Sequence, residues 1–211
     1  GMPQSITAVL GVPLLQATAC RFPDIQVELT QDQTHVLSNR MRSGRIDFAV
    51  MASPRPNPDV EIEPLLTEEL FHVIPDGAGL ALEPISFAAA STMRYVLPAV
   101  GNGLRASAEG HFRARSLPLD VAYEVDAIGM IPRCVEAGLG ASLLPGGFLQ
   151  QDQGFPRLKI RPLEGSCIRQ IVIARSASSE PSPAAISMIS LVRELSKAMV
   201  KGGDWMGGRL A

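Results

Sequence analysis

The 211-residue sequence is 46% hydrophobic and 19% charged, which is ordinary for a globular protein of one large or two small domains. Its formal net charge of −2 gives no basic footprint for phosphate contacts, which argues against DNA binding by these residues. No apolar run approaches the roughly 20 residues that span a bilayer, and the first residues lack the basic segment of a signal peptide, so we predict no membrane attachment.

The first part of the sequence predicts a helix, a strand, a second helix and a second strand. The helix covers residues 6–22, and alternating apolar residues over 25–30 predict the strand. The second helix begins at Thr34, whose hydroxyl can cap it, and ends at Gly44, which suits a left-handed terminal residue. Residues 46–51 are an apolar run typical of a parallel strand that is covered on both faces. This order predicts a βαβ unit with a right-handed crossover.

Strands and helices keep alternating along the rest of the sequence. Residues 69–75 predict a strand, and the Pro- and Gly-containing segment that starts at Pro75 predicts a boundary between two units. Further strands are predicted at 95–97, 121–125, 141–145 and 171–174, and further helices at 102–112, 128–135 and 182–199. The strand at 171–174 fits the first unit better than the second. Residues 202–211 are rich in Gly and are predicted to form a flexible tail.

Four of these segments resemble the effector-binding domain of LysR-type transcriptional regulators. Residues 22–29 read FPDIQVEL and residues 44–49 read GRIDFA, which are similar to the family's strand and to the end of the helix that follows it. Residues 64–75 read PLLTEELFHVIP and resemble the strand that enters the first crossover. Residues 136–145 read EAGLGASLLP and resemble a later family signature. The resemblance covers residues 2–200 in the expected order.

The resemblance implies an α/β, bilobed fold like that of type 2 periplasmic binding proteins, with two α/β subdomains joined by two crossover segments. Residues 1–75 and 166–201 are expected to form subdomain I, and residues 76–165 subdomain II. Gly1-Met2-Pro3 resembles the end of the family's first strand. Whole regulators of the family also carry an N-terminal winged helix-turn-helix, which we do not find in this sequence, so the expected role is sensing rather than DNA binding.

A fold of this kind binds its ligand where helix N-termini and strand ends of both lobes converge. Ser5 and Thr34 occupy positions at which the family places hydroxyl groups that contact the effector. Where Ala99 and Ala127 stand, relatives often carry hydroxyl residues, and Asn102 or Gly103 is expected to donate instead. The candidate ligand-binding residues are Ser5, Ile6, Thr34, Met51, Ser53, Pro98, Val100, Asn102, Gly103, Arg105, Asp126 and Ile128.

Several of these residues also have plainer interpretations. Ser5 can serve only as a helix cap, and Asp126 can cap the helix that follows it or face a cationic group of the ligand. Arg105 lies in the first turn of a predicted helix, where a cation opposes the helix dipole. It is therefore either a solvated surface residue or the partner of an effector carboxylate.

The cysteines and histidines favour no reactive site. The cysteines are odd in number and lack CxxC spacing, so we interpret them as small apolar side chains of a reduced cytoplasmic protein. The histidines are scattered, and one of them is predicted to project from a strand face. These residues are Cys20, Cys134, Cys167, His35, His72 and His111. Because common catalytic and nucleotide-binding motifs are also lacking, we predict no enzyme activity, catalytic residue, metal site or cofactor.

We therefore predict the effector-sensing and oligomerisation domain of a bacterial, cytoplasmic LysR-type regulator. It is expected to bind a small, anionic metabolite between its lobes and to control DNA binding by a separate N-terminal domain. The resemblance implies a homodimer and a full-length tetramer, with residues 6–22 and 25–30 as the dimer surface. The alternatives are a periplasmic-type solute-binding protein for transport and an enzyme built on the same fold.

Overall fold

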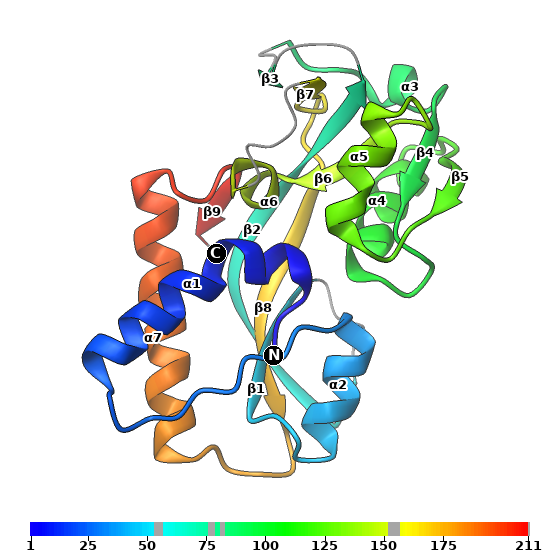
Figure 1. Cartoon of the computed structure of the whole chain (residues 1–211). Helices are drawn as coiled ribbons and strands as arrows, with labels where there is room; N and C mark the ends of the chain where they lie inside the picture. The colour runs from blue at the N-terminus through cyan, green and yellow to red at the C-terminus, as the bar shows by residue number, and fades with distance from the viewer. Residues whose placement is uncertain (53–56, 76–78, 81–82, 152–156, 211) are drawn as a thin grey trace.

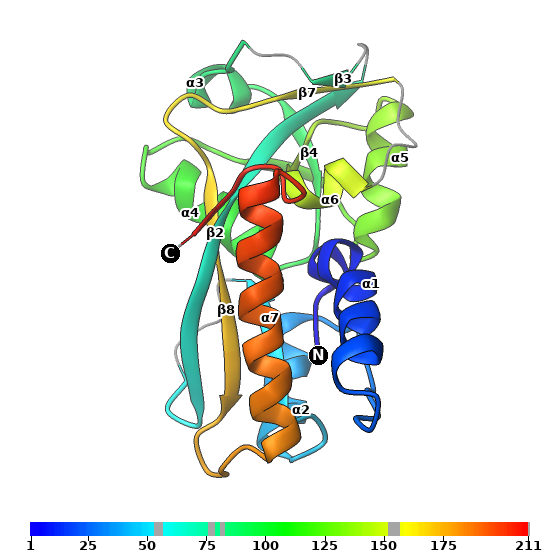
Figure 2. The same cartoon turned by 90° about the vertical axis from the view of Figure 1, so that its left-hand side faces the viewer.

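A computed structural model describes residues 1–52, 57–75, 79–80, 83–151 and 157–210, and it has two lobes (Figure 1). Two long strands, β2 (Val60–Pro75) and β8 (Ile168–Ser176), pair in antiparallel fashion and run between the lobes. Figure 2 shows the same two strands extending along the molecule behind the C-terminal helix. The chain therefore passes twice between the lobes, in agreement with the predicted bilobed α/β fold.

The first lobe is built from both ends of the chain. Its helices are α1 (Gln4–Arg21), α2 (Thr34–Arg42) and α7 (Pro183–Gly202), and β1 (Phe48–Ala52) pairs with β8. Alternate residues of β1 point to opposite faces of this sheet. Val50 packs with α1 and α7 on one face, and Met51 packs with α2 on the other. Because both faces are covered, the strand is almost entirely apolar, as the sequence predicted.

Two expectations for the first lobe are wrong. The ladder between β1 and β8 is antiparallel, whereas the sequence favoured a parallel strand. Residues 25–30 form no strand, and the one bridge next to them joins Met2 to Gln31. A groove of about 620 Å³ is lined in part by residues 25–29 and 45–48, and residues 25–29 have no ladder partner among the described residues. Their apolar side chains pack on the core of the first lobe instead.

The second lobe lies above the first in Figure 1 and contains the middle of the chain. Its strands β4 and β5 pair in parallel, while β6 and β7 add to the upper part of β2. Its elements are β3 (Gly79–Leu80), α3 (Phe87–Ala90), β4 (Arg94–Leu97), α4 (Gly103–Arg113), β5 (Asp120–Glu124), the 3-10 helix η1 (Ile128–Met130), α5 (Ile131–Glu136), β6 (Ser142–Pro145), α6 (Gly146–Gln151) and β7 (Leu158–Arg161).

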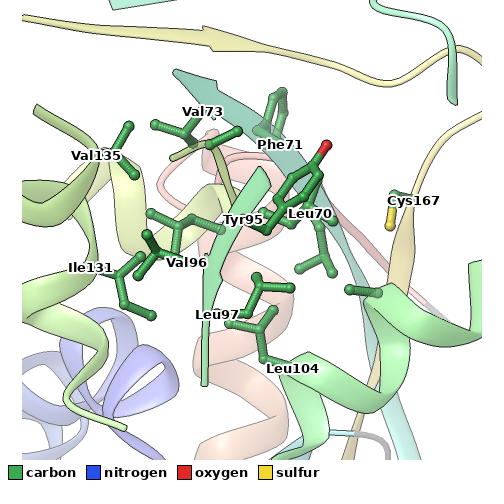
Figure 3. Close-up of a cluster of buried hydrophobic side chains, with 14 of the residues drawn as sticks. Leu70, Phe71, Val73, Tyr95, Val96, Leu97, Leu104, Ile131, Val135 and Cys167 are labelled. Atoms are coloured by element: carbon green, nitrogen blue, oxygen red, sulfur yellow. The ribbon is translucent and has the colours of Figure 1, made fainter. Parts of the chain in front are cut away.

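Tyr95 lies at the centre of the second lobe's core (Figure 3). The ring is fully buried, and its hydroxyl donates to the Ala90 carbonyl at 2.9 Å, so the polar end is satisfied. Leu104, Ala108 and Phe112 form the buried stripe of α4, as their spacing predicted. On β2, Leu66 belongs to the core of the first lobe and Leu70 to the core of the second, so the strand passes from one core to the other between them. The exact division into subdomains at 75/76 and 165/166 remains a prediction.

Residues 203–210 form a turn and a strand, where the sequence predicted a flexible tail. Gly203 ends α7 in the left-handed conformation with φ +80°, and β9 (Gly208–Leu210) then pairs with residues 66–68 of β2. Trp205 is only 2% exposed. Within the described part of the chain, no helix combines the length and apolarity needed to cross a membrane.

Candidate functional site

A cavity of about 140 Å³ lies between the lobes and takes residues from both of them. From the first lobe come the starts of α1 and α2, the end of β1 and the start of β8. From the second lobe come the start of α4 and the segment before η1. The lining residues are Pro3, Gln4, Ser5, Gln31, Asp32, Gln33, Thr34, Ala52, Asn102, Leu104, Asp126, Ile128 and Arg169.

The helices α1 and α2 both begin at this cavity without a side-chain cap. Their N-cap residues are Pro3 and Gln33, and neither side chain accepts a hydrogen bond from the helix. Thr34 is therefore the first residue of α2 and not its cap, which corrects the sequence prediction. Backbone amides in an uncapped first turn lack partners within the helix and carry a partial positive charge. Such amides are suited to bind oxygen atoms of a ligand.

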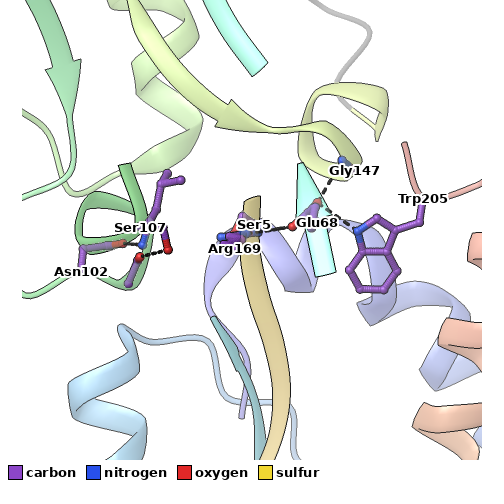
Figure 4. Close-up of polar contacts among 9 residues, drawn as sticks. Ser5, Glu68, Asn102, Ser107, Gly147, Arg169 and Trp205 are labelled. Carbon is purple, nitrogen blue, oxygen red and sulfur yellow. Dashed lines mark hydrogen bonds and ion pairs between the residues drawn. The ribbon is translucent and has the colours of Figure 1, made fainter. Parts of the chain in front are cut away.

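Arg169 is the one basic residue among the lining residues, and it is 2% exposed. Its Nε and Nη2 atoms donate to Oε2 of Glu68 at 2.8 and 2.6 Å, and Nη2 also donates to the Ser5 hydroxyl at 3.0 Å (Figure 4). The other oxygen of Glu68, Oε1, accepts from the Gly147 amide at 3.0 Å and from the Trp205 indole at 2.9 Å. The cavity wall is thus connected to α6 and to the C-terminal segment through the hydrogen bonds of the buried Glu68 carboxylate.

Asn102 and Asp126 form the polar part of the second lobe's wall. The Asn102 side chain caps α4 by accepting from the Leu104 amide at 2.9 Å. Asp126 accepts from the Ala99 amide at 3.1 Å through Oδ1, whereas the N-cap of η1 is Ala127. The predicted capping of the following helix by Asp126 is therefore wrong. Its carboxylate instead holds the turn before α4, and Asp126 is one of the residues that line the cavity.

The two lobes touch beside the cavity at Gly103 and Ala52. A Cβ atom added at Gly103 would lie 2.3 Å from the Ala52 carbonyl oxygen, and 3.4 Å from the Thr34 hydroxyl oxygen. Only a residue without a side chain permits this approach between the start of α4 and the end of β1. The lobes are therefore held close together at this edge of the cavity.

The structure brings together some of the predicted site residues and separates others. Those that line the cavity are Ser5, Thr34, Asn102, Asp126 and Ile128. Ile6 and Met51 are fully buried in the first lobe's core, and Val100 is 70% exposed. Pro98 and Gly103 are not among the lining residues. Ser53 lies outside the described residues.

Arg105 does not line the cavity, because its charge is used within the second lobe. It is 8% exposed, and its Nε donates to Glu109 at 2.6 Å. Its Nη1 donates to the Pro98 carbonyl at 3.3 Å and lies 3.7 Å from Glu124. Arg105 is thus not a solvated surface residue, and its charge is paired within the second lobe. Through the Pro98 carbonyl, Arg105 connects α4 to the turn that precedes this helix.

The sequence reasoning missed Arg169, Asp32, Gln31, Leu104 and Ala52 as lining residues. Arg169 had a detectable signal, because it is a charged residue within a mostly apolar strand at one crossover. Glu68 has the same character at the other crossover, and opposite charges in two buried crossover segments are expected to pair. Asp32 had no such signal, since it lies in a run of polar residues.

The histidines and cysteines show no arrangement that suggests catalysis. His72 is fully buried, and within the described residues neither of its ring nitrogens has a hydrogen-bond partner. Burial, followed by the charge of Arg161, lowers the pKa of His72 to about 4. Cys134 and Cys167 are buried and unpaired, and burial raises the pKa of the Cys167 thiol to about 12. No group of three His, Cys, Asp or Glu residues in the described ranges is arranged to hold a metal ion.

Comparisons with known proteins agree with this architecture. A family model described as "LysR substrate binding domain" matches residues 1–197. The chain is 26% identical over 202 residues to the uncharacterized HTH-type transcriptional regulator YfeR of Shigella flexneri, covering 95% of this chain and 65% of YfeR. The chain thus spans slightly less than two thirds of that relative.

Solved structures show the same fold. The regulatory domain of Synechocystis PCC6803 CcmR, in complex with 2-PG, superposes with a TM-score of 0.82 at 19% identity, covering 94% of this chain and 96% of that one. The effector-binding domain of QuiR, in complex with shikimate, has a TM-score of 0.81 at 19% identity and covers 94% of this chain and 95% of that one. With a family match across nearly its whole length, the chain belongs to the LysR substrate-binding domain family.

Proposed function

We propose that the chain is the effector-sensing domain of a bacterial, cytoplasmic LysR-type transcriptional regulator, and that it binds a small, anionic metabolite between its lobes. In this proposal the ligand controls DNA binding by a domain outside these 211 residues. The observation that carries it is the meeting of two uncapped helix starts, the buried Arg169 and the polar residues of the second lobe around one cavity. The structural neighbours CcmR and QuiR were solved in complex with 2-PG and shikimate, respectively, which supports a small-molecule ligand.

The proposal also includes self-association through the first lobe. Helix α1 exposes an apolar stripe at the spacing of one helix face, formed by Ala8, Val12, Leu15 and Ala19. Val12 is 64% exposed and Leu15 is 40% exposed. Exposed apolar stripes of this kind commonly mark protein–protein contacts. We propose that α1 pairs with a second copy of this domain, and that DNA contacts come from elsewhere in the regulator.

A thermal-shift screen of small acids, neutral metabolites and amines tests ligand binding. A ligand at 100 times its Kd is expected to stabilise the domain by about 2.7 kcal/mol. Calorimetry then compares the wild type with Thr34→Ala and Ser5→Ala, each expected to weaken binding about 10-fold through loss of one hydrogen bond. Ser187→Ala, an exposed change on α7, is the control with unchanged affinity.

The outcomes of this experiment separate the alternatives. Unchanged affinity in both cavity variants, with folding intact, would place the site elsewhere. Recovery of a chemically altered ligand would favour an enzyme over a sensor, since a sensor releases its effector unchanged. A gel shift in which residues 1–211 alone select a DNA sequence would contradict the assignment of DNA contacts to another domain.

A further inference from the structure

Arg169 lines the cavity, and one edge of its guanidinium has no acceptor among the described residues. Nε and Nη2 are occupied by Glu68 and Ser5, and no described residue accepts from Nη1. Nη1 is not one of the buried polar atoms that lack both a partner and contact with solvent, so solvent can reach it. The side chain as a whole is 2% exposed. Since Arg169 lines the cavity, Nη1 is the atom that it presents there. A buried arginine with one free donor edge is a built site for an oxyanion.

We infer that Arg169 binds the carboxylate of the ligand, and that the ligand is a small monocarboxylate carrying a hydroxyl or amino group. The inference rests on the proposed function and specifies the ligand class of the same cavity. The starts of α1 and α2 direct their first-turn amides to the same region, so the carboxylate meets Arg169 Nη1 and backbone donors together. Ser5, held by Arg169, adds a hydroxyl to this group.

The charges around the cavity favour one negative charge on the ligand over two. The charge of Arg169 is already shared with Glu68. Asp32 and Asp126 are the acidic residues of the described lining, and the charge of Asp32 is offset by Arg40 at 3.1 Å. No second unpaired cation stands among the described lining residues to receive another negative charge. A phosphate or a dicarboxylate would therefore meet Asp126 without compensation.

A carboxylate oxygen of Asp126 is available to accept a hydrogen bond from a donor group of the ligand. Asp126 is exposed, its Oδ1 accepts from the Ala99 amide, and no described residue donates to its Oδ2, so this oxygen is hydrated when no ligand is bound. A hydroxyl or ammonium group of the ligand is the complementary partner for this oxygen. The cavity measures about 140 Å³. A closed cavity of about 150 Å³ in another protein holds benzene, so about six non-hydrogen atoms of a ligand fit inside this cavity, which is partly open to solvent.

The test uses five probes of similar size on the 211-residue protein: L-lactate, L-alanine, propionate, oxalate and inorganic phosphate. Thermal shift and calorimetry are expected to show binding of lactate or alanine, at least about 10-fold weaker binding of propionate, and no binding of oxalate or phosphate. A wider panel of hydroxy- and amino-monocarboxylates with five to eight non-hydrogen atoms covers larger side groups. Neutral and cationic metabolites complete the panel.

Two variants assign the residues. Arg169→Gln with Glu68→Gln replaces the buried ion pair by a neutral hydrogen-bonding pair, which avoids leaving one charge alone. It is expected to weaken carboxylate binding about 10- to 100-fold. Asp126→Asn is expected to reduce the preference for lactate or alanine over propionate by about 10-fold. Asp120→Asn, an exposed change on β5, is the matched control with no effect.

Each result decides a separate point. Wild-type affinity in the folded double variant would remove Arg169 from the site. Stronger binding of phosphate or oxalate than of any monocarboxylate would overturn the ligand class. If only compounds without a carboxylate bind, the inference fails while a sensing function remains. If no compound of any class binds, the proposed function itself fails.

Discussion

The indole nitrogen of Trp205 donates to Oε1 of Glu68 at 2.9 Å, across 137 residues of sequence. Glu68 is fully buried, and its two oxygens accept from Arg169, Gly147 and Trp205. A buried carboxylate is tolerated only when its charge and lone pairs are matched in this way. Arg169 lies on β8, Gly147 lies in α6 of the second lobe, and Trp205 lies in the C-terminal segment. Glu68 therefore joins the crossover to both lobes.

Glu68→Gln is expected to destabilise the protein by about 3–5 kcal/mol, because it leaves the buried charge of Arg169 without its partner. The comparison is Glu63→Gln, which breaks an exposed ion pair with Arg193 and is expected to cost about 0–1 kcal/mol. Urea denaturation of both variants measures the difference. Equal effects would show that the buried pair contributes no more than a surface pair does.

Trp205→Ala is expected to cost about 3–5 kcal/mol, since it removes a large buried side chain. Trp205→Phe keeps most of the packing but takes one donor from Glu68, and about 1–3 kcal/mol is expected. Trp205 is the only tryptophan, so its fluorescence reports directly on this segment. An emission spectrum of the native protein that is typical of a fully solvated indole would contradict the burial of Trp205.

Local sequence patterns predicted the elements whose signals lie within a few residues. Ser182 caps α7 by accepting from the Ala185 amide, with Pro183 as the first helical residue. Asn102 caps α4 in the same way. Such signals need no knowledge of distant parts of the chain, because the capping side chain and the capped amide lie two or three residues apart.

The wrong or missed features depend on distant partners. Residues 25–30 alternate as a strand does, yet a strand also needs a neighbour, and only Met2 bridges their end. The Gly-rich C-terminus becomes β9 because residues 66–68 of β2 offer a free edge. Arg169 becomes a cavity residue because Glu68, 101 residues away, fixes its side chain. Periodicity does not show which distant segments pair, and of these features only the charges of Arg169 and Glu68 within apolar strands gave a signal in the sequence.

Acidification is expected to destabilise the protein through His72. Burial lowers the pKa of His72 from 6.5 to about 4 in the folded state, so the unfolded chain binds a proton at a higher pH than the folded chain does. The contribution of His72 to the free energy of unfolding is fully present above pH 6.5. It is lost as the pH falls toward about 4, and the total loss is about 3 kcal/mol. Urea midpoints between pH 7.5 and 4.5 measure it. His72→Phe is the control, and a pH dependence as steep as that of the wild type would contradict the role of His72.

Val12→Glu is expected to dissociate the proposed dimer, because it places a charge in the exposed apolar stripe of α1. Ile186→Glu is the matched control, since Ile186 is 52% exposed on α7, away from that stripe. Light scattering over a range of protein concentrations measures the mass. A wild-type protein that stays monomeric at high concentration, or an equal effect of both changes, would contradict pairing through α1.

Gly103→Ala tests the contact between the lobes. The new Cβ would lie 2.3 Å from the Ala52 carbonyl oxygen, so either the start of α4 or the end of β1 has to move. We expect a loss of about 1–3 kcal/mol, as for other overpacked sites, together with weaker ligand binding because the cavity wall shifts. Gly110→Ala is the control on the same helix. No atom lies within 4 Å of its added Cβ, and alanine favours the helix by about 1 kcal/mol. Urea denaturation is therefore expected to show changes in stability of opposite sign for the two variants, and calorimetry to show weaker binding only for Gly103→Ala. A stable Gly103→Ala protein with full affinity would show that the lobes need not approach this closely.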